Sequence, residues 1–249
     1  MKLIISPAKR MIVNTDDFEA TELPQYLEKT RHILLAMRQL SYSELQTLWH
    51  TSDNLTQVNY DQLQKINLTK QLTPAVLSFT GIQYQYMTPD LLTVPALDYL
   101  QNNLRILSGF YGILKPFDGI SPYRLEMQAK LAIDGKKNLY SFWDDQLYQA
   151  ISSKHEPIVN LASKEYSKTI SSFLQPQDQF ITIVFGHFID GKVKTLATLA
   201  KMARGEMVRF IAENQLQKID DLKFFDSSHY EFSQRHSTDT QLVFIDRYK

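Results

Sequence analysis

The chain has 249 residues, with 27 Lys and Arg against 27 Asp and Glu, so its formal net charge is zero. This balance argues against a polybasic nucleic-acid binder, and any anion-binding surface must come from an uneven placement of charge. The sequence contains no cysteine, which excludes disulfides, thiol redox catalysis and iron–sulfur clusters held by thiolates.

The composition also bounds the class of protein. Hydrophobic residues make up 43% of the chain, and no apolar run approaches the roughly 20 residues that a membrane span requires. The N-terminal apolar stretch is too short for a signal peptide, so we expect a cytoplasmic protein with no membrane partner. The six histidines lack metal-ligand spacing, and we expect neither a metal site nor a cofactor; the alternative is a hard cation held by carboxylates.

Predicted strands and helices alternate along the chain without strict βαβ regularity. Lys2 to Ser6 is predicted to form a buried first strand that Pro7 stops, and Ser41 to Glu44 matches the capping box of a helix beginning near Tyr42. The other elements that we expect are helices at 24–39, 53–58, 90–107, 142–152 and 197–214, strands at 158–161, 180–185, 192–195 and 242–245, a polar connection at 60–69 and a hairpin turn at 190–191.

No repeat, low-complexity tract or Pro/Gly/Ser-rich linker divides the chain, so we expect a single domain over residues 1–249. The interleaved elements predict a mixed α/β (α+β) fold, in which helices flank a mixed β-sheet, and not a Rossmann fold.

An apolar segment at 104–116 is interrupted by Gly109 and Gly112, with Arg105 before the glycines and Lys115 after them. Glycine leaves backbone N–H groups uncovered, so the segment is predicted to form a tight hairpin between two short helices. Such a hairpin can present amide donors to a phosphate. The alternative is a buried turn whose glycines only permit close packing.

The helix predicted at 197–214 carries a basic face with a glycine in its middle. When the residues are wound at 100° each, Lys201, Arg204 and Arg209 lie on the side opposite to the main apolar face, and Gly205 lies between them. The missing side chain opens a gap through which a phosphate or another backbone can approach. The alternative is a solvated charged face against which a neighbouring helix packs at the glycine.

A polar cluster follows the strand predicted at 158–161. Ser163 is placed to cap the next helix, and loops between strand ends and helix starts collect anions. Glu165 and Lys168 are three residues apart and can simply pair on one helix face.

Two further segments carry candidate site residues. In an extended Pro122–Met127 segment, Arg124 and Glu126 point to the same side, where they form either an ion pair or a ligand-orienting arginine beside a general base. Lys9 follows the end of the first strand, and this position makes it a candidate.

These segments together resemble the YaaA family of peroxide stress proteins. The resemblance spans essentially the whole chain and rests on Ser6–Lys9, Leu104–Gly112, Pro122–Met127, Asn160–Tyr166 and Ala203–Ile211. It implies a cytosolic protein that is induced under hydrogen peroxide stress and limits iron-dependent oxidative damage to DNA. It also implies DNA binding through a mixed α/β fold with a helix-hairpin-helix element, here Ser108 to Gly112, and a positive cleft of Lys9, Arg105, Arg124, Lys201, Arg204 and Arg209.

The chain departs from the family pattern at two places. Helix-hairpin-helix turns commonly read Gly-x-Gly, whereas Gly109 and Gly112 are one residue further apart. Many relatives have an acidic residue where this chain has Ile82, so a mechanism that uses that carboxylate does not carry over.

We weigh two main hypotheses for the function. The first is a DNA-binding stress protein with sequence-independent phosphate contacts. The alternative is an enzyme that acts on a phosphorylated or nucleotide small molecule in the same cleft, with Glu126 or Glu165 as general base. Direct iron handling has the least support from the residues. The predicted anion- or DNA-binding residues are Lys9, Arg105, Ser108, Gly109, Gly112, Arg124, Ser163, Lys201, Arg204, Gly205 and Arg209.

Overall fold

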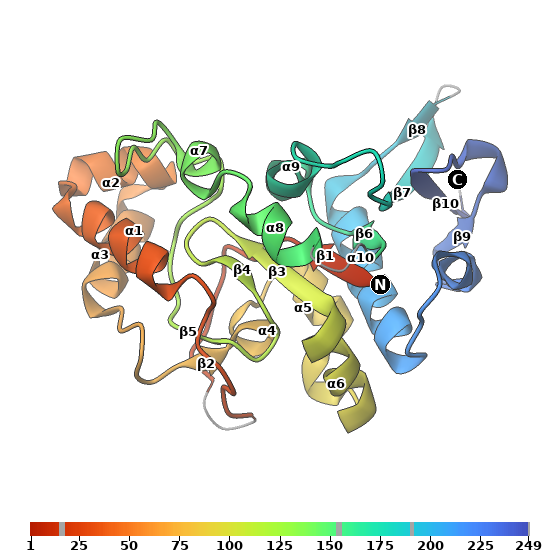
Figure 1. Ribbon diagram of the computed structural model, residues 1–249, viewed down its shortest axis with the longest axis horizontal. Helices are drawn as coiled ribbons and strands as arrows, with labels where there is room; N and C mark the ends of the chain where they lie inside the picture. Colours follow the sequence, from red (N-terminus) through yellow and green to blue (C-terminus); the bar gives the residue numbers. More distant parts are fainter. Residues whose placement is uncertain (15–17, 153–155, 190–191, 249) are drawn as a thin grey trace.

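The computed structural model describes residues 1–14, 18–152, 156–189 and 192–248, which form a mixed β-sheet of eight strands with helices around it (Figure 1). Seven strands follow the order β4-β3-β1-β6-β7-β10-β9, and β8 pairs with β7 beside this path. The strands are β1 (Lys2–Ile5), β3 (Leu104–Ser108), β4 (Gly112–Leu114), β6 (Ile158–Asn160), β7 (Phe180–Ile189), β8 (Lys192–Lys194), β9 (Tyr230–Phe232) and β10 (Gln241–Asp246), while β2 (Thr73–Pro74) and β5 (Gly119–Ile120) form a separate antiparallel pair.

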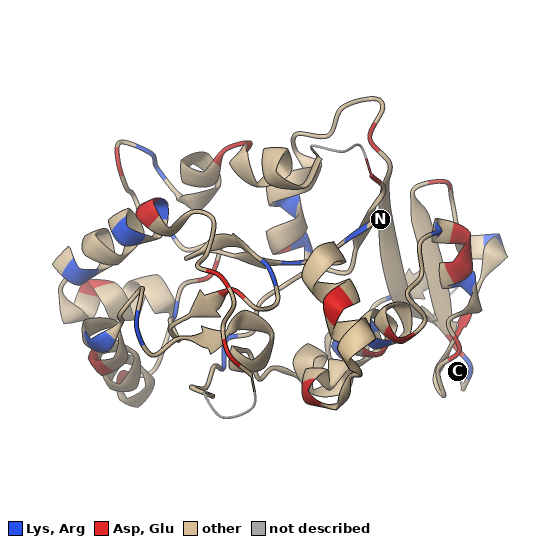
Figure 2. Cartoon of the chain, turned by 60° about the horizontal axis from the view of Figure 1, so that its bottom comes forward, with Lys and Arg blue, Asp and Glu red and all other residues tan. Residues whose placement is uncertain are grey.

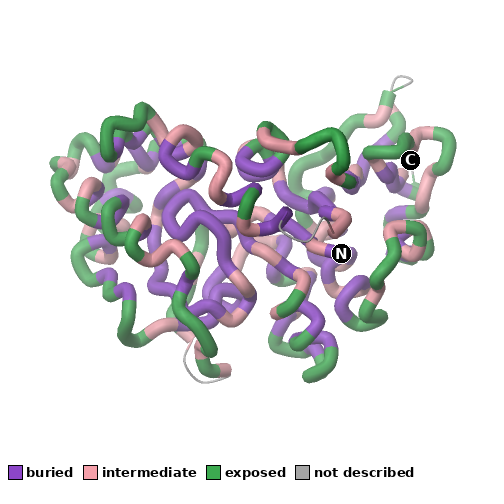
Figure 3. The backbone as a smooth tube through the Cα atoms, viewed as in Figure 1, coloured by how far each residue is buried: buried purple, intermediate pink, exposed green. Residues whose placement is uncertain are grey.

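The centre of the main sheet is parallel. Each of the strands β3, β1, β6, β7 and β10 is parallel to the next, whereas β4, β8 and β9 pair with their neighbours in the antiparallel sense. Leu3, Ile4 and Ile5 of β1 are completely buried (Figure 3), because both faces of the sheet are covered. The expected mixed α/β fold is therefore confirmed.

Two groups of helices pack on opposite faces of the sheet (Figure 1). Helices α8 and α9 contact each other on one face, and α5, α6 and α10 form a contacting group on the other. Helices α1 to α3 lie together at one end of the molecule. The helices are α1 (Leu27–Gln39), α2 (Tyr42–Trp49), α3 (Asp53–Lys65), α4 (Ala75–Ser78), α5 (Ile82–Met87), α6 (Val94–Asn103), α7 (Leu139–Trp143), α8 (Gln146–Ser152), α9 (Lys164–Ser171) and α10 (Ala197–Glu213), with short 3₁₀ turns at Pro89–Leu91, Ile219–Phe224 and Gln234–His236.

Local sequence signals locate some helix boundaries correctly and miss others. The capping box before α2 is confirmed, since the Ser41 hydroxyl accepts from the Glu44 N–H and the Glu44 carboxylate accepts from the Ser41 N–H. The polar connection expected at 60–69 is wrong up to Lys65, because α3 continues to that residue. The helix expected at 142–152 is instead two short helices, α7 and α8.

The central glycine segment is a β-hairpin, so the expected pair of short helices is wrong. Strands β3 and β4 are antiparallel, with Ser108 opposite Gly112, and the helix expected at 90–107 ends at Asn103. The apolar run from Leu104 lacks a clear period, and pairing with β1 makes it a strand. The buried-turn alternative describes the glycines correctly.

The return strand expected at 192–195 is present as β8, which pairs with β7. The turn expected at 190–191 lies outside the described residues. Within the described parts of the chain, every helix is too short or too polar to cross a bilayer.

Candidate functional site

The direction in which the chain crosses the sheet changes between β1 and β6. Within the main sheet the chain passes from β1 to β3 on one side, and from β6 to β7 on the other. In open α/β sheets, ligands bind outside the carboxyl ends of the strands at such a point. At these ends the Ser6 Oγ lies 3.2 Å from the Ser163 Oγ and accepts a hydrogen bond of 2.8 Å from the Ser163 N–H. We use the name sheet-edge site for Ser6, Lys9, Arg124, Glu126, Ser163 and Glu165.

Two basic side chains converge on one carboxylate in the sheet-edge site. Lys9 Nζ and Arg124 Nη2 each lie 3.0 Å from Oε1 of Glu126. The side chains of Arg124 and Glu126 are only 12% and 13% exposed, whereas that of Lys9 is 65% exposed. Among the described residues, the buried Nε of Arg124 has no hydrogen-bond partner. This nitrogen is therefore a hydrogen-bond donor that a ligand can use beside the ion pairs.

The glycine hairpin packs closely against the backbone of Leu125 and Glu126. A Cβ on Gly109 would lie 2.9 Å from the Leu125 carbonyl oxygen and 3.0 Å from the Glu126 carbonyl carbon, so only glycine permits this approach. The Ser108 hydroxyl is fully buried, accepts from the N–H groups of residues 110 and 111, and lies 2.7 Å from the hydroxyl of Tyr123. Gly112, at φ +78°, packs against residues 143 and 147. Two of the hairpin N–H groups, those of residues 110 and 111, are thus bonded inside the protein.

A second carboxylate belongs to the same cluster. Burial raises the pKa of Glu165, and the nearby charge of Glu126 adds to this rise, while the N–H of Gln128 and the charge of Lys9 oppose it. The Gln128 N–H lies 3.2 Å from Glu165 Oε1, and the Tyr140 hydroxyl donates to the Glu165 carbonyl at 2.9 Å. A carboxyl group with a raised pKa beside a second carboxyl group is an arrangement suited to general acid–base chemistry.

Two of the arginines expected in the cleft are committed elsewhere. The Arg105 guanidinium donates to the carbonyls of Gln101 and Leu104, at 3.2 and 2.7 Å. Its acidic neighbours include Glu156, which pairs with the amino group of residue 1, so Arg105 lies toward the amino end of β1 and away from the sheet-edge site. Arg209 pairs with Glu213 at 2.9 Å and donates to residue 88. Lys201 is exposed on α10.

Arg204 and Gly205 lie where α10 meets α5. A Cβ on Gly205 would lie 2.2 Å from the Gln83 carbonyl oxygen, so the gap predicted at this glycine is filled by the backbone of α5. Burial lowers the pKa of Arg204, and within the described parts of the chain its Nε has no partner and no acid pairs with it. The neighbouring-helix alternative is correct for Gly205, while Arg204 is left as an uncompensated cation.

The sequence interpretation did not select Gly81, Gln83 or Tyr84, although Gly81 and Tyr84 contact the turn after β1. The Tyr84 hydroxyl donates to the Ser6 carbonyl at 2.9 Å, and Gly81 sits so close to the turn after β1 that a Cβ there would be 2.7 Å from the Cβ of Ala8. Gln83 is 94% buried, and its amide nitrogen has no partner among the described residues. The short apolar and aromatic α5 gave no chemical signal, because only the fold brings it to the Ser6–Lys9 turn.

Exposed basic residues follow three of the central strands along the chain. Figure 2 shows Lys and Arg segments of several elements in the middle of the molecule. Residues 192–205 include four basic residues and no acidic one. The exposed basic residues that follow β1, β6 and β7 are Lys9, Arg10, Lys164, Lys168, Lys192, Lys194 and Lys201.

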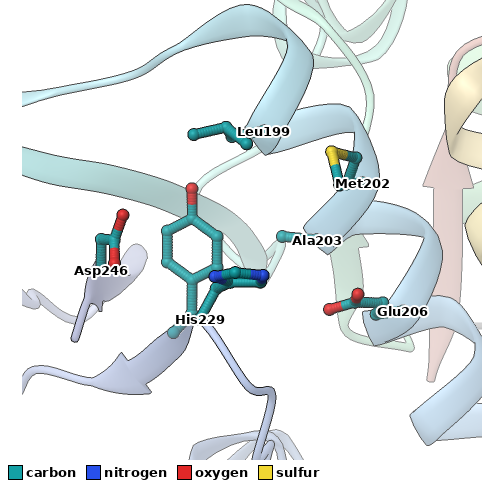
Figure 4. A pocket seen from close by; sticks show the side chains of 7 residues that line it. Leu199, Met202, Ala203, Glu206, His229 and Asp246 are labelled. Atoms are coloured by element: carbon teal, nitrogen blue, oxygen red, sulfur yellow. The ribbon is translucent and has the colours of Figure 1, made fainter. Parts of the chain in front are cut away.

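Two hollows occur away from the sheet-edge carboxylates, and neither is lined by Glu126 or Glu165. An open groove of about 750 Å³ runs along α3 and includes Lys65 and Lys70. A small cavity of about 20 Å³ lies between α10 and the last strands, with Glu206, His229 and Asp246 around it (Figure 4). The small cavity has space for about one water and is too small for a substrate.

A buried histidine lies behind this small cavity. His187 is fully buried, its Nδ1 lies 2.9 Å from Oδ2 of Asp246, and its Nε2 lies 3.3 Å from the Tyr230 hydroxyl. This arrangement joins β7, β9 and β10, so it holds the last strands together.

Comparison with known proteins finds a family and relatives that match almost the whole chain. The family described as peroxide stress protein YaaA matches residues 1–236. A UPF0246 protein of Lactiplantibacillus plantarum is 59% identical over 245 residues, which cover 98% of this chain and 99% of the relative. UPF0246 proteins of Lacticaseibacillus casei and Limosilactobacillus reuteri are 56% and 52% identical over 98% of this chain, covering 99% and 98% of the relatives.

Proposed function

Because this chain belongs to the family of the peroxide stress protein YaaA, we propose that it acts in the cytoplasmic response to peroxide by binding the phosphates of DNA at the sheet-edge site. The observation that carries the proposal is the convergence of Lys9 and Arg124, which are 115 positions apart in the chain, on one carboxylate at the carboxyl edge of the sheet. A chain with no net charge thereby gathers positive charge at one place.

The local charge favours a bound anion. Lys9 and Arg124 carry two positive charges and share the single carboxylate of Glu126 as their partner. The free Nε and the Nη2 of Arg124 form a fork that matches two phosphate oxygens. A phosphate can therefore replace Glu126 as the partner of both cations.

The exposed lysines of α9, β8 and α10 extend this binding surface for a polymer. Contacts to phosphates give affinity without sequence preference, so the binding is sequence-independent. The glycine hairpin has no part in it, because its amides are internal. Bound in this way, the protein would lie where iron-dependent oxidation damages DNA.

A titration of a fluorescent 20-base-pair duplex at 50 and 200 mM salt tests the proposal. With about four phosphate contacts, the affinity should fall about 100-fold between these concentrations. Arg124→Met should weaken binding strongly, whereas Arg31→Met, which removes an exposed arginine of α1, should not. Absence of binding at 50 mM salt, or binding insensitive to salt, would contradict DNA as the ligand.

The second candidate is an enzyme that acts on a phosphorylated or nucleotide small molecule at the same site. It is favoured by one observation, the raised pKa of Glu165 beside the ion-paired Glu126. In this case Lys9 and Arg124 orient the substrate phosphate and one glutamate moves a proton. Binding of adenosine 5′-monophosphate together with no binding of the duplex would select this candidate, and Glu165→Gln would then remove turnover while retaining affinity.

A further inference from the structure

Two of the buried side-chain donors that lack a partner among the described residues lie on the contacting helices α5 and α10. Across residues 1–14, 18–152, 156–189 and 192–248, the side-chain nitrogen of Gln83 and the Nε of Arg204 have no partner. Gln83 is 6% exposed, and burial lowers the pKa of Arg204 with no acid beside it. Buried polar groups are almost always satisfied, so each of these two donors calls for an explanation.

The two residues stand on helices that touch. Gly205, next to Arg204, approaches the Gln83 backbone so closely that a Cβ there would be 2.2 Å from its carbonyl oxygen. Helix α5 also contacts the turn after β1, through Gly81 against Ala8 and through the Tyr84 hydroxyl on the Ser6 carbonyl.

The turn of Ser6–Lys9 connects α5 with the ion pairs of the sheet-edge site. The carbonyl of Ser6 accepts from the Tyr84 hydroxyl of α5, and the side chain of Lys9 pairs with Glu126. Four residues span at most about 14 Å, so a single ligand lying on the turn can reach both sides.

We propose that Gln83 and Arg204 form a second anchoring point of the sheet-edge site, which binds an anionic oxygen of the same ligand. The proposal rests on the proposed function for the first anchoring point, Lys9 and Arg124. Both free groups of the pair are donors and one is cationic, so the matching group is an oxyanion such as a phosphoryl oxygen. A ligand with two phosphoryl groups, either joined in a diphosphate or successive along a nucleic-acid strand, satisfies both points.

The test uses Gln83→Met and Arg204→Met in the full chain, with Gln85→Met as the matched control, because Gln85 is exposed on the same helix. The probes are inorganic phosphate, adenosine 5′-diphosphate and the 20-base-pair duplex. We expect at least fivefold weaker binding of the diphosphate or of the duplex by each of the two variants, with an unchanged or higher melting temperature without ligand. The control should match the wild type.

The outcomes separate the two proposals. Unchanged affinity in Gln83→Met and Arg204→Met, together with loss in Arg124→Met, would overturn the second anchoring point and keep the first. Loss in Gln83→Met and Arg204→Met, with Arg124→Met unaffected, would keep the second and overturn the first. A wild-type protein that binds none of the three probes would overturn both. A lowered melting temperature with unchanged affinity would show that Gln83 and Arg204 serve packing.

Discussion

Replacing Gly205 by alanine tests how α10 meets α5. The change gains about 1 kcal/mol of helix propensity, because glycine is unfavourable inside a helix. Against this gain, the new Cβ would lie 2.2 Å from the Gln83 carbonyl oxygen and 2.9 Å from the Met87 nitrogen. Both are backbone atoms, so the helices must separate.

Overpacking of this kind costs about 3 kcal/mol, which leaves Gly205→Ala about 2 kcal/mol less stable than the wild type. For a chain of this size the melting temperature should fall by about 4–8 °C. Urea unfolding measures the free energy directly, and Thr198→Ala, an exposed change on the same helix, should be neutral or slightly stabilising. A Gly205→Ala protein more stable than the wild type would refute the close contact and restore Gly205 as an open approach for a ligand.

Three other substitutions test separate parts of the structure. Burial raises the pKa of Asp118 to about 6, so the native state holds this proton more tightly than the unfolded chain. The free energy of unfolding therefore falls by about 3 kcal/mol as pH rises from about 4 to about 6. Asp118→Asn should remove this loss, so its gain in urea unfolding over the wild type should be larger at pH 7.5 than at pH 3.5, and an equal difference at both pH values would contradict the reasoning. Gly109→Ala should displace the Glu126 backbone and weaken duplex binding several-fold, with a stability loss of about 1–3 kcal/mol in the same unfolding assay; unchanged binding would remove the hairpin as a support of the site. Ser41→Ala should cost about 1 kcal/mol through loss of the α2 cap, and an unaltered urea midpoint would mean that this end of the helix contributes nothing.

Features that depend on near neighbours could be predicted from the sequence. The capping box at Ser41 involves residues three apart, and the pairing of Arg124 with Glu126 follows from alternation along an extended chain. The convergence of Lys9 on the same carboxylate could not be predicted without the family resemblance, because it depends on where the loops of a folded sheet end.

The wrong predictions concern features that depend on contacts between residues far apart in the sequence. Residues 104–108 form a strand because β1, a hundred residues earlier, pairs with them. Arg105 was expected in the cleft, but its guanidinium lies toward the amino end of β1, which the linear order does not reveal. The helical projection of residues 197–214 placed Arg204 on an open polar face, whereas α5 packs on that side of α10.

The central position of β1 has a consequence for synthesis in the cell. Residues 2–5 are synthesised well before their two neighbouring strands, which begin at Leu104 and Ile158. At about 5–20 residues per second, the second neighbour follows roughly 8–30 s later. Through that interval β1, whose Leu3, Ile4 and Ile5 are completely buried in the fold, has both edges unpaired. The nascent chain therefore needs either transient shielding by chaperones or slow, late closure of the sheet around this strand.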